Sequence, residues 1–219
     1  MDATLEQLWH TLRDRLEARQ LLGGRRPALS LRIPGTGDMW YGRAADVAPR
    51  RLPLLGLDEP DALGPADARA PLHAGVYALR PDVCAVASGG GPFGLCLEGF
   101  GGAMPGVFDE QVRHLGHMAP PQPAAAGERL RSALGRGGNV LLVQGEPLAL
   151  GMTGARLALN AELFEKCAKA YVLATASGGA VRPLPWIVRH VANRRLMKEE
   201  QRARQRVRHG LLPEESKGY

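Results

Sequence analysis

The spacing of hydrophobic residues along the chain predicts a series of helices and short strands. Leucines recur at helical spacing through residues 2–22, and Gly23-Gly24 ends that pattern. Residues 28–33 alternate between apolar and polar side chains, as strands do, and the turn residues at 34–37 follow them. Residues 39–43 resemble a returning strand. We expect these two segments to form a hairpin, followed by a loop rich in Pro and Gly to about residue 65.

The middle of the chain predicts a helix, a buried strand and a less regular stretch. The helix is expected to start near Asp67 and to end before Pro81, because proline disfavours the helical conformation of the preceding residue. Residues 83–87 are wholly apolar, which is typical of a strand buried on both faces. We further expect a strand at 93–97 and a helix at 107–118.

The second half of the chain predicts a hairpin between two helices and then a final basic helix. A helix at 127–134 is expected before a hairpin formed by residues 139–143 and 147–150. Thr153 is the expected N-cap of a long apolar helix that follows, because its hydroxyl can accept a hydrogen bond from the first helical turn. The basic helix is expected at 186–208.

Length and composition set broad limits on the protein class. A chain of 219 residues can bury a sizeable core, and we expect one domain at 1–180 with a basic C-terminal helix and tail at 181–219. The sequence has no run of about 18 apolar residues and no leader-like start, so we expect a cytoplasmic protein without a membrane partner. Its three cysteines show no CxxC spacing, which argues against a disulfide framework and a thiolate zinc site.

The positive charge is concentrated near the C-terminus. Residues 182–209 carry nine Lys/Arg and two Glu, a balance of +7, so the remainder of the +6 chain is close to −1. Residues 192–209, which carry most of this charge, contain no Phe, Trp or Tyr and no known motif, and this disfavours nucleic-acid binding. We expect the basic helix to cover a neighbouring subunit or to contact an acidic partner.

Three segments carry a family resemblance. LHAGVYALRPDVCAVAS at 72–88 resembles the "LH…YxxRPDvxAVvH" motif of the class II aldolase/adducin family. Residues 107–113 and 139–151 are similar to the family's later helix and to its "vLLxnHGxlxxG" hairpin. Residues 29–32, LSLR, stand where the family has Asn-x-Ser-x-Arg, so the resemblance spans about 5–176.

The resemblance implies both an architecture and an assembly. It implies an α/β fold with three α/β/α layers and a mixed, mostly antiparallel central sheet. It also implies a homotetramer with active sites between neighbouring subunits. Sugar-phosphate aldolases, a pentose-phosphate epimerase and the non-enzymatic head of adducin belong to this family.

The residues that hold the family's divalent metal are replaced in this chain. The resemblance places the metal-binding Glu at Arg69, the strand histidines at Ser88 and Gly90, and the last histidine at Gln144. Zinc prefers imidazole, thiolate or carboxylate ligands, and a guanidinium repels a cation. We therefore expect no metal and no other cofactor at this site.

The family's phosphate-binding residues are also incomplete. Ala28 replaces the family's Asn, and Asp67-Ala68 replaces a pair of serines. Ser30 and Arg32 persist as candidate substrate-binding residues, and they share a face if the strand is regular.

Three functional interpretations remain open. In the first, the domain is a non-catalytic interaction or assembly protein. In the second, it is a metal-independent lyase or isomerase acting on a small carbonyl or carboxylate ligand. Arg69 would then stabilise the developing oxyanion, and Glu98 is the candidate base. The third is binding of nucleic acid or an acidic surface by the basic tail.

The first two interpretations predict different clefts. An enzyme should present an open polar pocket with Arg69, a general base and substrate contacts from Ser88, Gly89, Gly90 and Gln144. A scaffold should have a collapsed cleft, or an Arg69 neutralised by an internal carboxylate such as Asp67.

Overall fold

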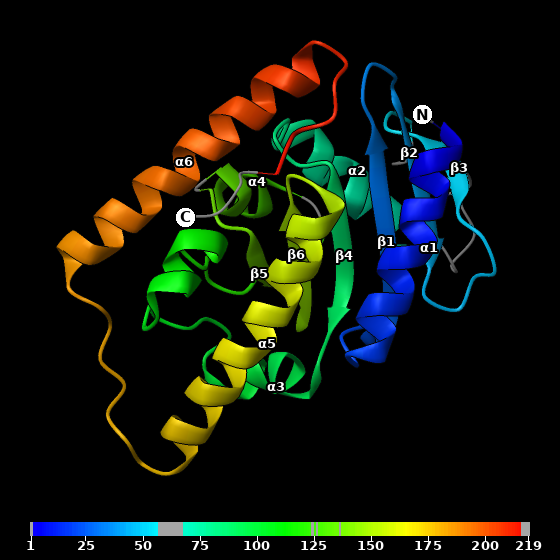
Figure 1. Ribbon diagram of the computed structural model, residues 1–219. Coiled ribbons are helices and arrows are strands. Elements are labelled where there is room, and N and C mark those ends of the chain that lie inside the picture. The colour runs from blue at the N-terminus through cyan, green and yellow to red at the C-terminus, as the bar shows by residue number, and fades with distance from the viewer. Residues whose placement is uncertain (1, 57–67, 124, 126, 136, 216–219) are drawn as a thin grey trace.

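A computed structural model of the chain describes residues 2–56, 68–123, 125, 127–135 and 137–215. Its centre is a six-stranded sheet in the order β3-β2-β1-β4-β6-β5 (Figure 1). All neighbouring strands are antiparallel, and an isolated bridge between Gln122 and Val143 is parallel. The expected α/β class with a mixed, mostly antiparallel sheet is confirmed. The strands are β1 (Gly23–Ile33), β2 (Asp38–Arg43), β3 (Arg50–Pro53), β4 (Ala85–Gly90), β5 (Val140–Val143) and β6 (Glu146–Gly151).

Helices cover both faces of the sheet, and the alternation of side chains along the strands explains why. Leu29 and Leu31 of β1 pack in one cluster with the helices α1 and α5. Leu148 and Leu150 of β6 belong to a second cluster, on the opposite face, with α2 and α4. The three-layer arrangement follows from these two cores. The helices are α1 (Asp2–Ala18), α2 (Ala70–Leu79), α3 (Pro92–Cys96), α4 (Glu128–Gly135), α5 (Gly154–Ala176) and α6 (Trp186–Arg208), with short turns η2 (Leu97–Phe100) and η3 (Gln111–Leu115).

Two predicted elements are wrong, and the strand β3 forms within the segment that was expected to be a loop. The strand expected at 93–97 is the helix α3, because Pro92 favours a first helical turn and the Glu165 carboxylate accepts hydrogen bonds from the Phe93 and Gly94 amides, both at 2.8 Å. The helix expected at 107–118 shrinks to η3, since the Gln111 side chain binds the backbone on its N-terminal side and Gly116 has a left-handed φ of 69°.

The β5–β6 hairpin and the start of α5 agree with the sequence. Val143 pairs with Glu146 across a two-residue turn, and the Thr153 hydroxyl accepts a hydrogen bond from the Arg156 amide at 3.1 Å. The first described residue of α2 is Ala70, and the expected start at Asp67 lies outside the described residues. Within the described part of the chain, no helix is both long and apolar enough to cross a membrane.

Helix α6 lies along the outside of the domain (Figure 1). Its two acidic residues connect it to the body. Glu200 accepts from Arg80 at 3.0 Å, and Glu199 forms ion pairs with Arg113 and Arg156. Leu196 and Ala203 of this helix pack with Met152 in a small apolar cluster. The two glutamates thus face inward.

Candidate functional site

The turn between β5 and β6 places two left-handed residues at one end of the sheet. Gln144 and Gly145 have φ values of 54° and 77°, the combination that a type I′ hairpin turn requires. A positive φ is unusual for glutamine, since its Cβ crowds the backbone. In this turn the Gln144 amide oxygen accepts a hydrogen bond from Arg69 Nη1 at 3.2 Å. The structure therefore brings together two positions that the resemblance assigns to the metal site.

Arg69 forms a buried ion pair with Glu146 at the N-terminal end of α2. Arg69 Nη2 donates to Glu146 Oε2, and the side chains of the two residues are 7% and 5% exposed. Glu146 Oε1 also accepts a hydrogen bond from the Arg25 backbone amide at 2.6 Å. Burial alone would raise the pKa of Glu146, but the Arg25 amide and the Arg69 guanidinium together lower it below its usual value. The carboxylate is therefore ionised and fully engaged.

Sequence reasoning missed Glu146 as the partner of Arg69. Asp67, the carboxylate considered for that role, lies outside the described residues. One signal was available, because Glu146 is the only acidic residue between Glu128 and Glu162. It also has the strand parity of Leu148 and Leu150, which face α2. A lone acid on that face, at the end nearest Arg69, is the partner that a buried arginine requires.

A buried chain of hydrogen bonds links β4, α2 and β1. Ser88 Oγ lies 2.7 Å from His73 Nε2, and His73 Nδ1 lies 2.8 Å from Ser30 Oγ. Ser30 Oγ is in turn 2.8 Å from the Tyr77 hydroxyl. Burial, together with the Arg69 cation, lowers the pKa of His73 to about 3, so this imidazole is neutral. The structure thus places Ser30 and Ser88 beneath α2, where internal partners occupy their hydroxyls.

Arg32 lies on the same face of β1 as Ser30, as a regular strand requires. Its side chain contacts the C-terminal end of α2. Its Nη2 donates to the backbone oxygens of Tyr77 and Arg80, and its guanidinium lies 4.9 Å from the centre of the Tyr77 ring. Burial lowers the pKa of Arg32. The contacts give this arginine a role at the C-terminal end of α2, where cations are favourable.

Gly89 and Gly90 are held closely by neighbouring backbone and proline atoms. A Cβ on Gly89 would lie 2.7 Å from the Gly23 carbonyl oxygen, and Gly89 has a φ of 108°. A Cβ on Gly90 would lie 2.5 Å from Pro147. Close strand packing accounts for both glycines.

Glu98 is exposed, and its carboxylate lies against Gly145 in the β5–β6 turn. The structure therefore gathers Glu98, Gln144, Arg69 and Glu146 around one hairpin end. Ser30, Ser88 and Arg32 belong to the interface between the sheet and α2. The residues expected to form one cleft are thus divided between two environments.

A cavity of about 280 Å³ adjoins Arg69 and is strongly basic. Arg69 contributes to its wall, and Arg43 within it is paired with Asp46 at 2.8 Å. Such a wall favours an anionic ligand over a cation. The cavity is lined by Arg25, Arg26, Pro27, Tyr41, Arg43, Ala45 and Arg69.

The residues at this site do not fit a divalent metal. The four positions that the resemblance assigns to metal ligands present a guanidinium, a hydroxyl, a glycine and an amide. The nearby carboxylate, Glu146, already binds Arg69 and the Arg25 amide. Over the described residues, no group of three or more His, Cys, Asp or Glu side chains is arranged to hold a metal ion.

Comparisons with known proteins identify the fold. No protein-family model matches the chain, and no curated protein is significantly similar to it in sequence. Among solved structures, YgbL from Klebsiella pneumoniae is 19% identical and has a TM-score of 0.68 over 88% of this chain and 99% of its own. L-fuculose-1-phosphate aldolase from Thermus thermophilus is 20% identical, with a TM-score of 0.61 over 83% of this chain and 100% of its own. An aldolase II superfamily protein from Pseudomonas syringae is 14% identical, with a TM-score of 0.64 over 94% and 92%.

Proposed function

We propose that this chain, which has the class II aldolase fold, is a non-catalytic interaction or assembly protein. In this proposal the Arg69–Glu146 ion pair takes the place of the metal ion. The observation that carries it is the burial of that pair, whose carboxylate lies where an incoming oxyanion would have to bind. This is the arrangement expected of a scaffold, although the neutralising carboxylate comes from β6.

The chemistry of Arg69 supports this proposal. To stabilise a developing oxyanion, a guanidinium has to present free N–H groups to the reacting atoms. Arg69 Nη1 and Nη2 instead donate to Gln144 and Glu146, and the remaining Nε–H, which has no hydrogen-bond partner among the described residues, is buried. Opening the pair would leave a buried carboxylate without its partner, which is costly. The hydroxyls of Ser30 and Ser88 are likewise engaged internally.

A metal-independent lyase or isomerase is the second candidate, and the basic cavity beside Arg69 favours it. Arg25, Arg26 and Arg43 surround enough space for a small sugar-acid-like carbonyl or carboxylate compound. Glu98, at the β5–β6 turn, would be the base. This activity requires the substrate to displace Glu146 from Arg69.

We also propose a cytoplasmic homo-oligomer, a tetramer by resemblance, in which α6 contacts a neighbouring subunit or an acidic partner. The exposed apolar side chains of Trp186, Ile187 and Val191 at the start of α6 support a contact there. Light scattering should give a mass above that of one chain. Trp186→Ser should lower that mass if α6 lies at the subunit contact.

Metal analysis and substrate turnover test the proposed function. The purified protein, incubated with zinc and then desalted, should retain much less than one metal per chain. It should also fail to cleave or isomerise a panel of sugar phosphates, keto acids and sugar acids, with or without zinc. Stoichiometric zinc would overturn the site assignment.

The Arg69→Met variant separates the two candidates. Turnover by the wild type that Arg69→Met abolishes, while circular dichroism shows the fold intact, would establish the second candidate. Arg51→Met is the matched control, because Arg51 forms an ion pair with Asp38 nearer the surface and does not line the cavity beside Arg69.

A further inference from the structure

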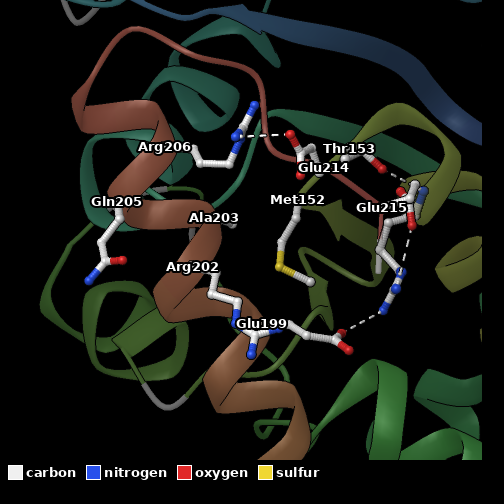
Figure 2. Close-up of a pocket in the computed structure, with 10 residues that line it drawn as sticks. Met152, Thr153, Glu199, Arg202, Ala203, Gln205, Arg206, Glu214 and Glu215 are labelled. Atoms are coloured by element: carbon white, nitrogen blue, oxygen red, sulfur yellow. Dashed lines mark hydrogen bonds and ion pairs between the residues drawn. The ribbon is translucent and has the colours of Figure 1, made fainter. Parts of the chain in front are cut away.

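A second cavity, of about 390 Å³ (Figure 2), is lined by Met152 and Thr153, which directly follow β6. Arg69 contacts Glu146, at the opposite end of that strand. The cavity is enclosed by the turn from β6 to α5, the last turns of α6, and residues 214–215, which return alongside the helix. Figure 2 shows the Met152 side chain between the α6 residues and the acidic residues of that returning segment. The cavity thus combines an apolar side with a charged rim, as small-molecule sites often do.

Three arginines line this cavity, and they differ in how they are held. Arg156 is 6% exposed, and Glu199 at 3.2 Å and His114 at 3.1 Å fix its guanidinium. Arg206 pairs with Glu214 at 3.0 Å. Arg202 has no ion pair with any residue that the structure describes.

The acidic residues of the returning segment are the loosely held part of this arrangement. Glu214 and Glu215 are 75% and 42% exposed, and Glu215 reaches Arg156 at 3.5 Å. In the Arg206–Glu214 pair both side chains are exposed, and such pairs contribute only about 0–1 kcal/mol. The Arg156–Glu215 contact is long, and its carboxylate is exposed. An external anion can therefore exchange with these carboxylates at little cost.

We propose that this cavity binds a small oxyanion, a carboxylate or a phosphate group, between Arg156, Arg202 and Arg206. Glu214 and Glu215 act as internal competitors for the arginines. When their carboxylates turn away, three guanidinium groups and one carboxylate, Glu199, remain at the site. Guanidinium groups bind both carboxylate and phosphate through paired hydrogen bonds, so the geometry selects oxyanions. The site shares no residue with the Arg69 cavity and does not depend on the function proposed for it.

Calorimetric titration of the full chain with succinate and, separately, with inorganic phosphate tests the site. Each titration is run at constant ionic strength, with chloride as the reference anion. We expect Arg202→Gln to weaken binding about tenfold, the loss of one charge-assisted hydrogen bond. Arg208→Gln removes the same charge from an exposed position on α6 outside the cavity, and should change the affinity less than twofold.

The anion affinity of variants at Glu214 and Glu215, the internal competitors, tests the proposal a second time. The double variant Glu214→Gln/Glu215→Gln should bind the same anion several-fold more tightly than the wild type. If the wild type binds succinate more tightly than phosphate, the site is assigned to carboxylates. If it binds phosphate more tightly than succinate, the site is assigned to phosphate compounds. Equal losses in Arg202→Gln and Arg208→Gln would mean diffuse attraction to a basic helix and would overturn the site, as would binding of neither anion above chloride.

Discussion

The two ends of α2 both carry a buried arginine, but they neutralise it in different ways. At the N-terminal end, Arg69 forms an ion pair with one carboxylate, that of Glu146 in the β5–β6 hairpin. At the C-terminal end, Arg80 meets Asp82 at 2.7 Å and Glu200 of α6 at 3.0 Å. Arg80 also donates to the Gly138 carbonyl at 2.9 Å and to the Asn139 side chain at 3.0 Å.

This difference shows what a buried arginine can and cannot indicate about function. Both guanidiniums are desolvated, and both have carboxylate partners. Arg69 stands at a position where the resemblance implies a metal ligand, and Arg80 belongs to the Arg-Pro-Asp turn at 80–82. Burial and pairing therefore mark arginines that hold elements together, and catalysis would need a donor that is free to meet a substrate. The two ends can be compared directly by mutation.

The largest loss of stability is expected for Arg80→Met. It leaves the buried carboxylates of Asp82 and Glu200 without the guanidinium that they share and removes one of the ion pairs that connect α6 to the body. We expect the free energy of unfolding to fall by about 3–5 kcal/mol, the usual cost of breaking a buried ion pair from one side. Urea denaturation measures it, and the exposed Arg51→Met should change the value by less than about 1 kcal/mol. A loss similar to that of Arg51→Met would show that Arg80 does not join α6 to the domain.

A smaller loss is expected at the N-terminal end for Arg69→Met. One carboxylate is orphaned there, and the Arg25 amide still binds it, so we expect about 2–3 kcal/mol. The double variant Arg69→Met/Glu146→Met removes both charges and should recover most of that loss. Urea denaturation of the wild type, Arg69→Met, Glu146→Met and the double variant gives the coupling energy between the two residues. Additive losses would contradict a direct pair and would reopen the case for Arg69 as a free electrophile.

Much of the fold was predictable, because local patterns encode it. The alternation of β1, the β5–β6 hairpin and the Thr153 cap all act over a few residues. The hairpin turn was expected around Gly145-Glu146 and lies one residue earlier, at Gln144-Gly145. The helix α3 was missed because its stability depends on Glu165, about 70 positions away in the sequence, whose carboxylate binds the Phe93 and Gly94 amides.

The proximity of Arg69 and Gln144 was predictable from the sequence, and the partners of the other candidate residues were less so. The resemblance assigned both Arg69 and Gln144 to metal-ligand positions, and the two side chains form a hydrogen bond. The pairing of Arg69 with Glu146, and of Ser88 with His73, depends on the tertiary packing of the β5–β6 hairpin and α2. Such contacts between distant segments leave little trace in a single sequence.

The smallest effect, and the one that depends on pH, is expected at Glu200. Burial raises the pKa of this carboxyl to about 7; Arg80 and Arg204 oppose the shift, and Asp82 adds to it. The folded protein therefore holds a proton that the unfolded chain releases near pH 4.5, so the contribution of Glu200 to stability is lost as pH rises from about 4.5 to 7. Glu200→Gln keeps a neutral partner for Arg80 and removes this titration. Above pH 7 we expect it to be more stable than the wild type by about 1–2 kcal/mol, and near pH 4.5 we expect no advantage.

The difference between the two proteins isolates Glu200 from the other carboxylates. Asp46 and Glu146 have lowered pKa values, so both make the folded protein more stable as pH rises in the acid range. They are present in the wild type and in Glu200→Gln alike, and cancel in the difference. Thermal denaturation of both proteins between pH 4.5 and 8 should thus show curves that separate as pH rises. Curves that stay parallel would mean that Glu200 is ionised throughout, held by Arg80 as firmly as Glu146 is held by Arg69.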